Sequence, residues 1–353
     1  MKNKIDSLET LRGFAALVVA FYHFPSTSFL HIKHGYLGVY FFFALSGFVI
    51  AFNYFDKITN VNDLIKFQIK RFFRLYPIHI FTLCVVLGIQ VLKLFTLKFF
   101  DLSAGNDAFS PEQWYTLKDF FNHLFLTQAI FNNGYAFSWN GAAWTISTEF
   151  YTYLIFGFLV LLTRNNKFIF VLILSLYIIF FKFITSYTNI YFNPLFTGCL
   201  KTFFMGCLIF FIYKKIQIRL NDIFFILLLT TSILTFLIYK DKFFIDLNIL
   251  FCVVILLVSI LKDDCFINKF LNFFPLVYFG TISYSFYMIH QSILYLYIQI
   301  LKLIFKVNFL NDGGVTTNTG DPFYDTMITI SYIVISGFFA ILMYNYIENK
   351  FRR

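Results

Sequence analysis

The chain has 353 residues, of which 59% are hydrophobic and only 13% are charged, and its mean hydropathy is +0.74. This composition excludes a soluble globular domain, and the 23% of aromatic residues is typical of surfaces that face lipid. The net charge of +10 does not indicate nucleic-acid binding, because lysine and arginine gather in the cytoplasmic loops of membrane proteins. We therefore predict an all-α, polytopic helical bundle that forms one membrane-embedded domain over residues 1–353.

The apolar segments predict about ten transmembrane helices. Most basic residues fall in the alternate loops that are cytoplasmic if the N-terminus is inside, so we expect both termini in the cytoplasm. The chain is then a multi-pass protein of the cytoplasmic (inner) membrane. The predicted spans are residues 8–29, 34–54, 77–98, 143–163, 167–185, 195–214, 221–239, 244–261, 276–303 and 324–347.

The first span carries two ionisable residues, Arg12 and His23. Eleven residues make about three helical turns, so both side chains lie on one face, roughly 16 Å apart along the axis. A snorkelling arginine and a core histidine would be structural. Charged groups inside a span are costly, however, and the shared face favours a functional polar track. A histidine can accept a hydroxyl proton, and an arginine can hold a phosphate.

Residues 55–76 form a basic segment that we predict to be an amphipathic interfacial helix ending at Pro77. Its arginines are three residues apart and share a face, which suits either membrane anchoring or a phosphorylated donor. We expect Ile65, Ile69 and Phe72 to face the membrane, and Lys66, Lys70 and Arg74 to face water. The donor site would comprise Arg71, Arg74 and Tyr76.

Two further spans contribute candidate residues. Ser46 lies among small residues that favour close helix packing, and a reactive serine needs an adjacent base. Trp144 and Glu149 open the fourth predicted span, after a long external loop at 99–142. Thr145, Glu149 and Thr152 share one helical face. Glu149 either forms a structural ion pair or orients His23.

The ninth predicted span has a polar stripe of Ser283, Tyr287 and His290 at helical spacing. Hydrogen bonding between helices explains such a stripe without a catalytic role. The remaining histidines give no metal-ligand spacing, and the five cysteines include no C-x-x-C pair, so we expect no metal. The histidines concerned are His31, His34, His79 and His123.

In this order, these motifs resemble the acyltransferase 3 family of polytopic membrane O-acyltransferases. A basic residue, ten residues and a histidine match Arg12 and His23, within an L-R-G start at Leu11. The other matching segments are Gly38–Phe48, Arg71–Pro77, Trp144–Glu149 and Ile282–His290. The family includes O-antigen and peptidoglycan O-acetylases, and this chain resembles the members that lack a fused SGNH domain.

The resemblance implies transfer of an acyl group, usually acetyl, from cytoplasmic acetyl-CoA or another acyl-CoA to a hydroxyl of a cell-surface or lipid-linked glycan. It implies His23 as general base, Glu149 and Arg12 as further catalytic residues, and membrane lipids, acyl-CoA and the glycan as partners. The substrate-binding residues would be Arg71, Arg74, Tyr76, Ser46, Trp144, Tyr151, Tyr287 and His290. Direct transfer and a covalent acyl-enzyme both remain open.

Two other functions fit parts of the pattern. A transporter or flippase for an anionic or lipid-linked solute would also need a charged intramembrane track, although we find no internal repeat in the sequence. A structural subunit of a polysaccharide assembly complex would tolerate substitution of Arg12 and His23.

Overall fold

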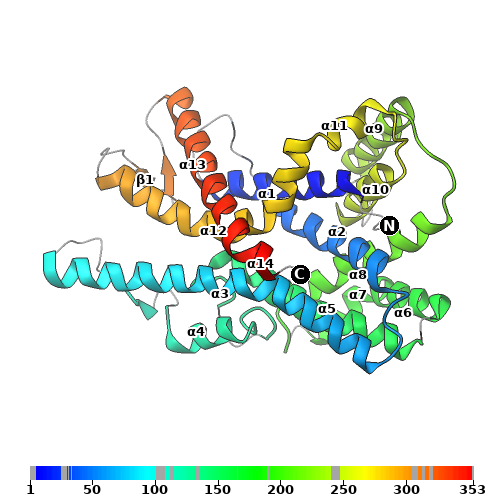
Figure 1. The fold of residues 1–353 in the computed structure, drawn as a ribbon, viewed down its shortest axis with the longest axis horizontal. Coiled ribbons are helices and arrows are strands. Elements are labelled where there is room, and N and C mark those ends of the chain that lie inside the picture. Colours follow the sequence, from blue (N-terminus) through cyan, green and yellow to red (C-terminus); the bar gives the residue numbers. More distant parts are fainter. Residues whose placement is uncertain are drawn as a thin grey trace.

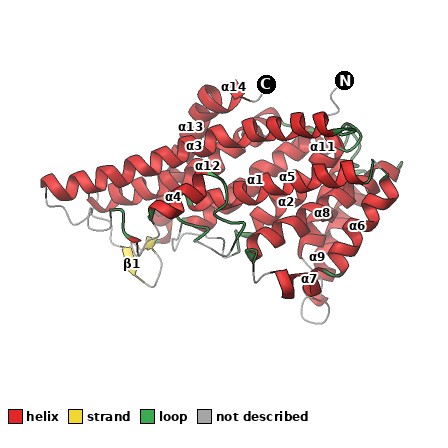
Figure 2. Ribbon diagram, turned by 90° about the horizontal axis from the view of Figure 1, so that it is seen from below, coloured by secondary structure: helices red, strands yellow, loops and turns green. Residues whose placement is uncertain are grey.

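A computed structural model describes residues 5–24, 30, 32, 34–100, 108–111, 115–131, 135–164, 166–188, 191–239, 247–303, 309–311, 315–317 and 321–351. The predicted all-α class is confirmed, since nearly all of the regular secondary structure among these residues is helical (Figure 2). One short antiparallel hairpin, β1 (Phe309–Asn311) with β2 (Val315–Thr317), is the exception. His31 and the N-terminal Met1–Lys4 lie outside the described residues.

The helices are arranged in chain order as follows. The first part of the chain contains α1 (Asp6–His23), α2 (Leu37–Tyr54), α3 (Val61–Phe100), α4 (Leu117–Leu124), the 3-10 turn η3 (Gly141–Ala143) and α5 (Trp144–Leu162). The middle contains α6 (Lys167–Ile179), α7 (Phe181–Thr188), α8 (Pro194–Lys215), α9 (Asp222–Tyr239) and α10 (Leu247–Ser259). The last part contains α11 (Phe266–Leu271), α12 (Phe274–Leu303), α13 (Pro322–Met343), the π-helical turn η4 (Tyr344–Glu348) and α14 (Asn349–Phe351).

Each predicted span coincides with a helix, or with the pair α6 and α7. Among the described residues, five helices are long and apolar enough to cross a membrane, or up to six if α6 and α7, bent by 69°, form one broken span. These five segments are Leu37–Tyr54, Val61–Phe99, Gly141–Leu162, Pro194–Lys215 and Pro322–Phe351. The chain is therefore a multi-pass membrane protein, and the figure of ten crossings stays a prediction.

The helix expected to end at Pro77 does not end there. The basic segment and the third predicted span form one continuous helix, α3, with Pro77 inside it. Proline removes one backbone donor and frees a carbonyl in the preceding turn, but neighbouring groups in a membrane bundle can satisfy the backbone nearby. Close to this proline, Tyr284 of α12 donates to the carbonyl of Leu75 at 2.6 Å, so a side chain of α12 holds α3 two residues before Pro77.

Glycines allow the central helices to approach at backbone contact. A methyl group at Gly280 of α12 would lie 2.0 Å from the carbonyl oxygen of Glu9 in α1. On the other side, a methyl group at Gly47 of α2 would lie 1.9 Å from the carbonyl oxygen of Phe203 in α8. Small residues at crossings are the usual means of helix association in membranes. They bring α12 against α1 and α2 against α8, and α1, α2 and α12 border the site described below.

Three helices run in the same direction past this centre. His23 of α1 meets His290 of α12, while Glu9, three to four turns earlier in α1, lies against Gly280 of α12. On α3, Leu75 contacts Tyr284 of α12, and further along both helices Lys93 Nζ lies 4.5 Å from the ring centroid of Tyr295. Figure 1 shows the later parts of α3 and α12, together with β1, at the left side of the molecule.

Candidate active site

A small cavity of about 80 Å³ lies where α1, α2, α3, α5 and α12 meet. Three arginines and one carboxylate, Glu149, line it, and two further carboxylates, Glu9 and Glu348, pair with Arg12 and Arg74 at its edge. The polar lining residues are Arg12, Ser46, Arg71, Arg74, Thr145, Glu149, Tyr153, Ser283, Tyr284 and Tyr287, and Phe42, Phe43 and several aliphatic residues complete it. A site for an anionic group thus lies within the helical bundle.

Two of the arginines are each held by a partner on their own side of the cavity. Arg12 Nη1 lies 3.0 Å from Glu9 Oε2, one turn away on α1. Arg71 Nη2 donates to the Tyr54 hydroxyl at 2.7 Å, and its guanidinium lies 4.9 Å from the centroid of that ring. Both contacts orient a guanidinium while leaving donors for a ligand, because each guanidinium carries five N–H groups.

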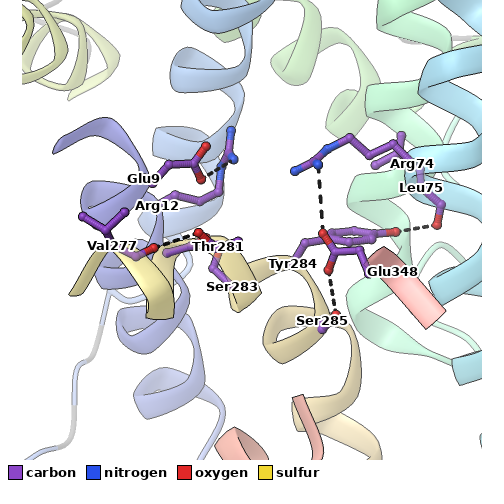
Figure 3. A network of polar contacts seen from close by, with 11 residues as sticks. Glu9, Arg12, Arg74, Leu75, Val277, Thr281, Ser283, Tyr284, Ser285 and Glu348 are labelled. Atoms are coloured by element: carbon purple, nitrogen blue, oxygen red, sulfur yellow. Dashed lines mark hydrogen bonds and ion pairs between the residues drawn. The ribbon is translucent and has the colours of Figure 1, made fainter. Parts of the chain in front are cut away.

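Arg74 does not face water with Lys66 and Lys70, as the amphipathic pattern predicted. Its side chain turns inward, and Nη1 lies 4.0 Å from Oε1 of Glu348. Figure 3 shows the guanidinium groups of Arg74 and Arg12 pointing toward one another above α12. The partner of Arg74 is a carboxylate from another part of the chain, and the pattern of polar residues within one helix cannot predict such a partner.

Glu348 belongs to the π-helical turn η4 and is only 2% exposed. Its Oε2 accepts a hydrogen bond of 2.7 Å from Ser285 of α12 (Figure 3). A buried carboxylate needs such partners, because desolvating a charge is expensive. The turn thereby connects the end of α13 to α3 and α12 beside the cavity.

Glu149 is held by two hydroxyl groups. Ser46 Oγ of α2 donates to Glu149 Oε1 at 2.5 Å, and Tyr153 donates to the same oxygen from one turn further along α5. The hydroxyls of Ser46 and Tyr153 are themselves 2.8 Å apart. Charge-assisted hydrogen bonds of this kind fix a carboxylate firmly. The carboxylate of Glu149 is thus held in the lining of the cavity that Arg12, Arg71 and Arg74 also line.

His23 pairs with another histidine, not with Glu149. Its Nδ1 lies 2.9 Å from the carbonyl oxygen of Val19 and 3.3 Å from Nε2 of His290. His290 Nδ1 lies 2.5 Å from the carbonyl oxygen of Tyr287. Carbonyl oxygens only accept, so each Nδ1 carries the proton and His290 Nε2 is an acceptor. This assignment leaves Nε2 as the basic nitrogen of His23.

Four residues predicted to bind substrate lie outside the lining of this cavity, namely His290, described above, and three aromatic residues. The Tyr76 hydroxyl donates to the carbonyl of Leu124 at the end of α4, at 3.0 Å. Trp144 is buried and packs edge-on against Phe43 and Phe137. The Tyr151 hydroxyl lies 3.4 Å from the carbonyl oxygen of Phe125. Aromatic residues near a motif thus support the loop and α4 that surround the site.

Other residues reach the cavity although the sequence interpretation assigned them no role. Tyr153 and Tyr284 line it, and Glu348 lies beside it as the partner of Arg74. Tyr153 had a visible signal, because it stands four residues after Glu149 and shares its helical face. Glu348 had one too, since it is an intramembrane carboxylate. Its partner could not be known from the sequence.

No group of three or more potential metal ligands occurs among the described residues. His79 and His123 lie close, with ring centroids 6.2 Å apart, but His79 Nε2 lies 2.8 Å from the carbonyl oxygen of His123 and His123 Nε2 lies 3.1 Å from Ser138 Oγ. These contacts fasten α4 and the following loop to α3.

Comparison with known proteins assigns the chain to the same family as the sequence motifs do. A family model described as an acyltransferase domain matches residues 5–344. The O-acetyltransferase OatA of Staphylococcus aureus (strain NCTC 8325 / PS 47) is 26% identical over 99% of this chain, and its homologue in strain COL matches equally well. A second protein of strain COL is 25% identical over 99% of the chain.

This chain spans 57% of the length of each of these relatives. No solved structure gives a significant match. The family match covers all five helices that form the cavity. The chain belongs to the acyltransferase 3 family.

Proposed function

We propose that this protein is a membrane O-acetyltransferase that moves an acetyl group from acetyl-CoA to a hydroxyl of a cell-surface or lipid-linked glycan. The observation that carries the proposal is the cavity in which Arg12, Arg71 and Arg74 converge with Glu149, with His23 about three turns beyond Arg12 on α1. Family membership and the likeness to OatA support the reaction type.

The cavity supplies the donor side of the reaction. A space of about 80 Å³ holds a few water molecules or the acyl-bearing end of a thioester, so the nucleotide of acetyl-CoA lies outside it. The exposed Lys66 and Lys70 precede Arg71 and Arg74 on α3 and extend the positive charge outward. Guanidinium groups match the geometry of phosphate oxygens. The donor therefore enters from the end of α3 that carries these residues, which we place in the cytoplasm.

His23 acts on the acceptor. Its Nε2 accepts the proton of the glycan hydroxyl while the hydroxyl oxygen attacks the thioester carbon. A C–O ester bond forms, the C–S bond breaks, and the proton passes to the departing CoA sulfur. His290 keeps the His23 ring in the required tautomer by accepting from Nδ1.

The test uses the purified full-length chain in lipid nanodiscs with acetyl-CoA and a neutral methyl glycoside as acceptor. We expect release of free CoA that depends on the acceptor, and a loss of roughly 100-fold or more in turnover for His23→Ala. The matched control is His34→Ala, because His34 is exposed and lines neither cavity. Retained turnover in His23→Ala would refute the role of His23, and acceptor uptake by proteoliposomes of the same chain without CoA release would favour the transporter.

Mass spectrometry of surface glycans from cells with and without the protein gives the acceptor in its natural setting. We expect an added acetyl mass on one glycan class that disappears in cells carrying His23→Ala at equal membrane expression. Unchanged acetylation in those cells would count against this function.

A further inference from the structure

A second, larger cavity of about 290 Å³ lies beyond the first one, between the later part of α3, residues 135–141 and the later part of α12. It is lined by aromatic rings and side-chain amides. The lining residues are Val86, Ile89, Gln90, Tyr115, Phe137, Trp139, Asn140, Gly141, Gln291, Ser292 and Tyr295, and none of these described residues is charged. This neutral lining contrasts with the three arginines of the first cavity.

The same helical faces line both cavities. On α12, Ser283 and Tyr287 face the first cavity and Gln291 and Tyr295 face the second, at successive four-residue steps. Residues four apart lie above one another on a helix, so these side chains form one stripe.

The segment from η3 into α5 repeats the pattern. Gly141 lines the second cavity, and Thr145, Glu149 and Tyr153 line the first, again four residues apart. On α3, Arg71 and Leu75 face the first cavity, and Val86 and Gln90 face the second, three turns later. Three elements therefore lead from one cavity to the other.

Asn140 lines the second cavity, is 1% exposed and lies between α3 and α12. Its Nδ2 donates to Thr82 Oγ1 of α3 at 2.9 Å and to the carbonyl of Met288 in α12 at 3.4 Å. Its Oδ1 accepts from the backbone N–H of Ala142 at 3.3 Å. These bonds connect the wall of the second cavity to α3 and to α12, where Met288 lies two residues before His290.

Ser292 gives an independent sign of a ligand. It is 4% exposed and lines the second cavity, yet its hydroxyl has no hydrogen-bond partner among the described residues. A buried polar group without a partner is costly, and a ligand hydroxyl would satisfy it. Gln291 stands beside it and leaves little space at Gly141, where a methyl group would lie 2.7 Å from Gln291 Oε1.

We propose that the second cavity binds one neutral sugar ring of the acceptor, an inference that rests on the proposed function. The C–H face of a pyranose packs on Trp139, while the Tyr295 ring carries the ammonium group of buried Lys93 at 4.5 Å from its centroid. The sugar hydroxyl groups pair with the amides of Gln90 and Gln291 and with the Ser292 hydroxyl. The acceptor thus occupies the end of the stripe opposite to the arginines, and the reactive hydroxyl reaches His23, whose neighbour His290 directly precedes Gln291 on α12.

The test compares Gln291→Leu and Ser292→Ala with the wild-type chain in nanodiscs. The probes are methyl β-D-glucopyranoside and methyl N-acetyl-β-D-glucosaminide, with the methyl glucuronide as a charged comparison. Binding is followed by tryptophan fluorescence, because Trp139 lines the cavity, and Trp139→Phe identifies the source of the signal. Transfer is followed by CoA release.

We expect a saturable fluorescence change with the neutral glycosides and a weaker one with the glucuronide. Gln291→Leu and Ser292→Ala each raise the Kd and the acceptor KM by about tenfold, while the KM for acetyl-CoA changes by less than about twofold. The matched control is Gln68→Leu, which removes an amide that lines neither cavity and donates to the carbonyl of Phe150.

The outcomes separate the two proposals. If the chain acetylates the glycosides and both variants keep the wild-type acceptor KM, the sugar site is overturned while the acetyltransferase stands. If the chain binds the glycosides in a manner lost in Gln291→Leu but releases no CoA, the acetyltransferase is overturned and the sugar site is supported. Absence of saturable binding by the wild-type chain, or tighter binding of the glucuronide, overturns the sugar site.

Discussion

His23 of α1 and His290 of α12 place two ring nitrogens, Nδ1 and Nε2, 3.3 Å apart, although 267 residues separate them in the chain. The carbonyls of Val19 and Tyr287 each hold a proton on Nδ1 of the neighbouring ring. The pair therefore presents one unprotonated nitrogen, Nε2 of His23, to a substrate.

Loss of this pairing is expected to slow turnover without weakening donor binding. His290→Ala removes the acceptor for His23 Nδ1–H, so the ring can rotate or change tautomer, and kcat falls by roughly 10- to 100-fold. The KM for acetyl-CoA stays near that of the wild type, because His290 does not line the arginine cavity. Steady-state kinetics of CoA release measure both constants. An increase in the donor KM with unchanged kcat would contradict this role.

The carboxylate of Glu149 is expected to matter more than either hydroxyl that holds it. Glu149→Gln leaves three arginines in the cavity without this negative charge and lowers kcat by about tenfold or more. Tyr153→Phe removes one of two donors and has a smaller effect, because Ser46 Oγ still donates to Glu149. Equal loss of activity in the two variants, measured as kcat for CoA release, would argue against this ranking.

The ion pair of Arg74 and Glu348 is expected to act as a unit. Glu348→Ala leaves Arg74 without the carboxylate that draws it inward, so the KM for acetyl-CoA rises about tenfold, and Arg74→Ala has a comparable effect. The double variant is then hardly worse than either single variant, which gives a coupling of about 1 kcal/mol. Additive losses in the double-mutant cycle would show that the two residues act separately.

Substitution of the crossing glycines is expected to destabilise the bundle. Alanine at Gly280 or Gly206 would place a methyl group 2.0 Å from Glu9 O or 1.9 Å from Ala44 O, and overpacking of this kind costs about 1–3 kcal/mol or more. Gly88→Ala in α3 is the matched control, because its methyl group meets nothing within 4 Å. We expect that control to unfold at the same or a higher temperature, since alanine favours helix by about 1 kcal/mol. Thermal unfolding in detergent measures all three, and a wild-type midpoint for Gly280→Ala would disprove backbone contact at that crossing.

Local patterns in the sequence determined where helices form and which side chains share a face. Hydropathy and the 3.6-residue period located α1, α2, α5 and α8, and they aligned Arg12 with His23, because both signals depend only on neighbours along one helix. The order of the motifs identified the family, which the family match confirms. The same local reasoning predicted that a helix ends at Pro77 and that Arg74 faces water, and both predictions were wrong.

Contacts between helices were decided only by the tertiary structure. Arg74 turns inward and pairs with Glu348. Glu149 accepts hydrogen bonds from Ser46 and Tyr153. The neighbour of His23 is His290 and not Glu149. Each of these pairs depends on which helices are adjacent and at what level they cross, and crossings set by Gly47 and Gly280 leave no periodic signal. The sequence by itself therefore singled out the charged residues that line the first cavity, whereas helix packing assigned their partners and created the second cavity.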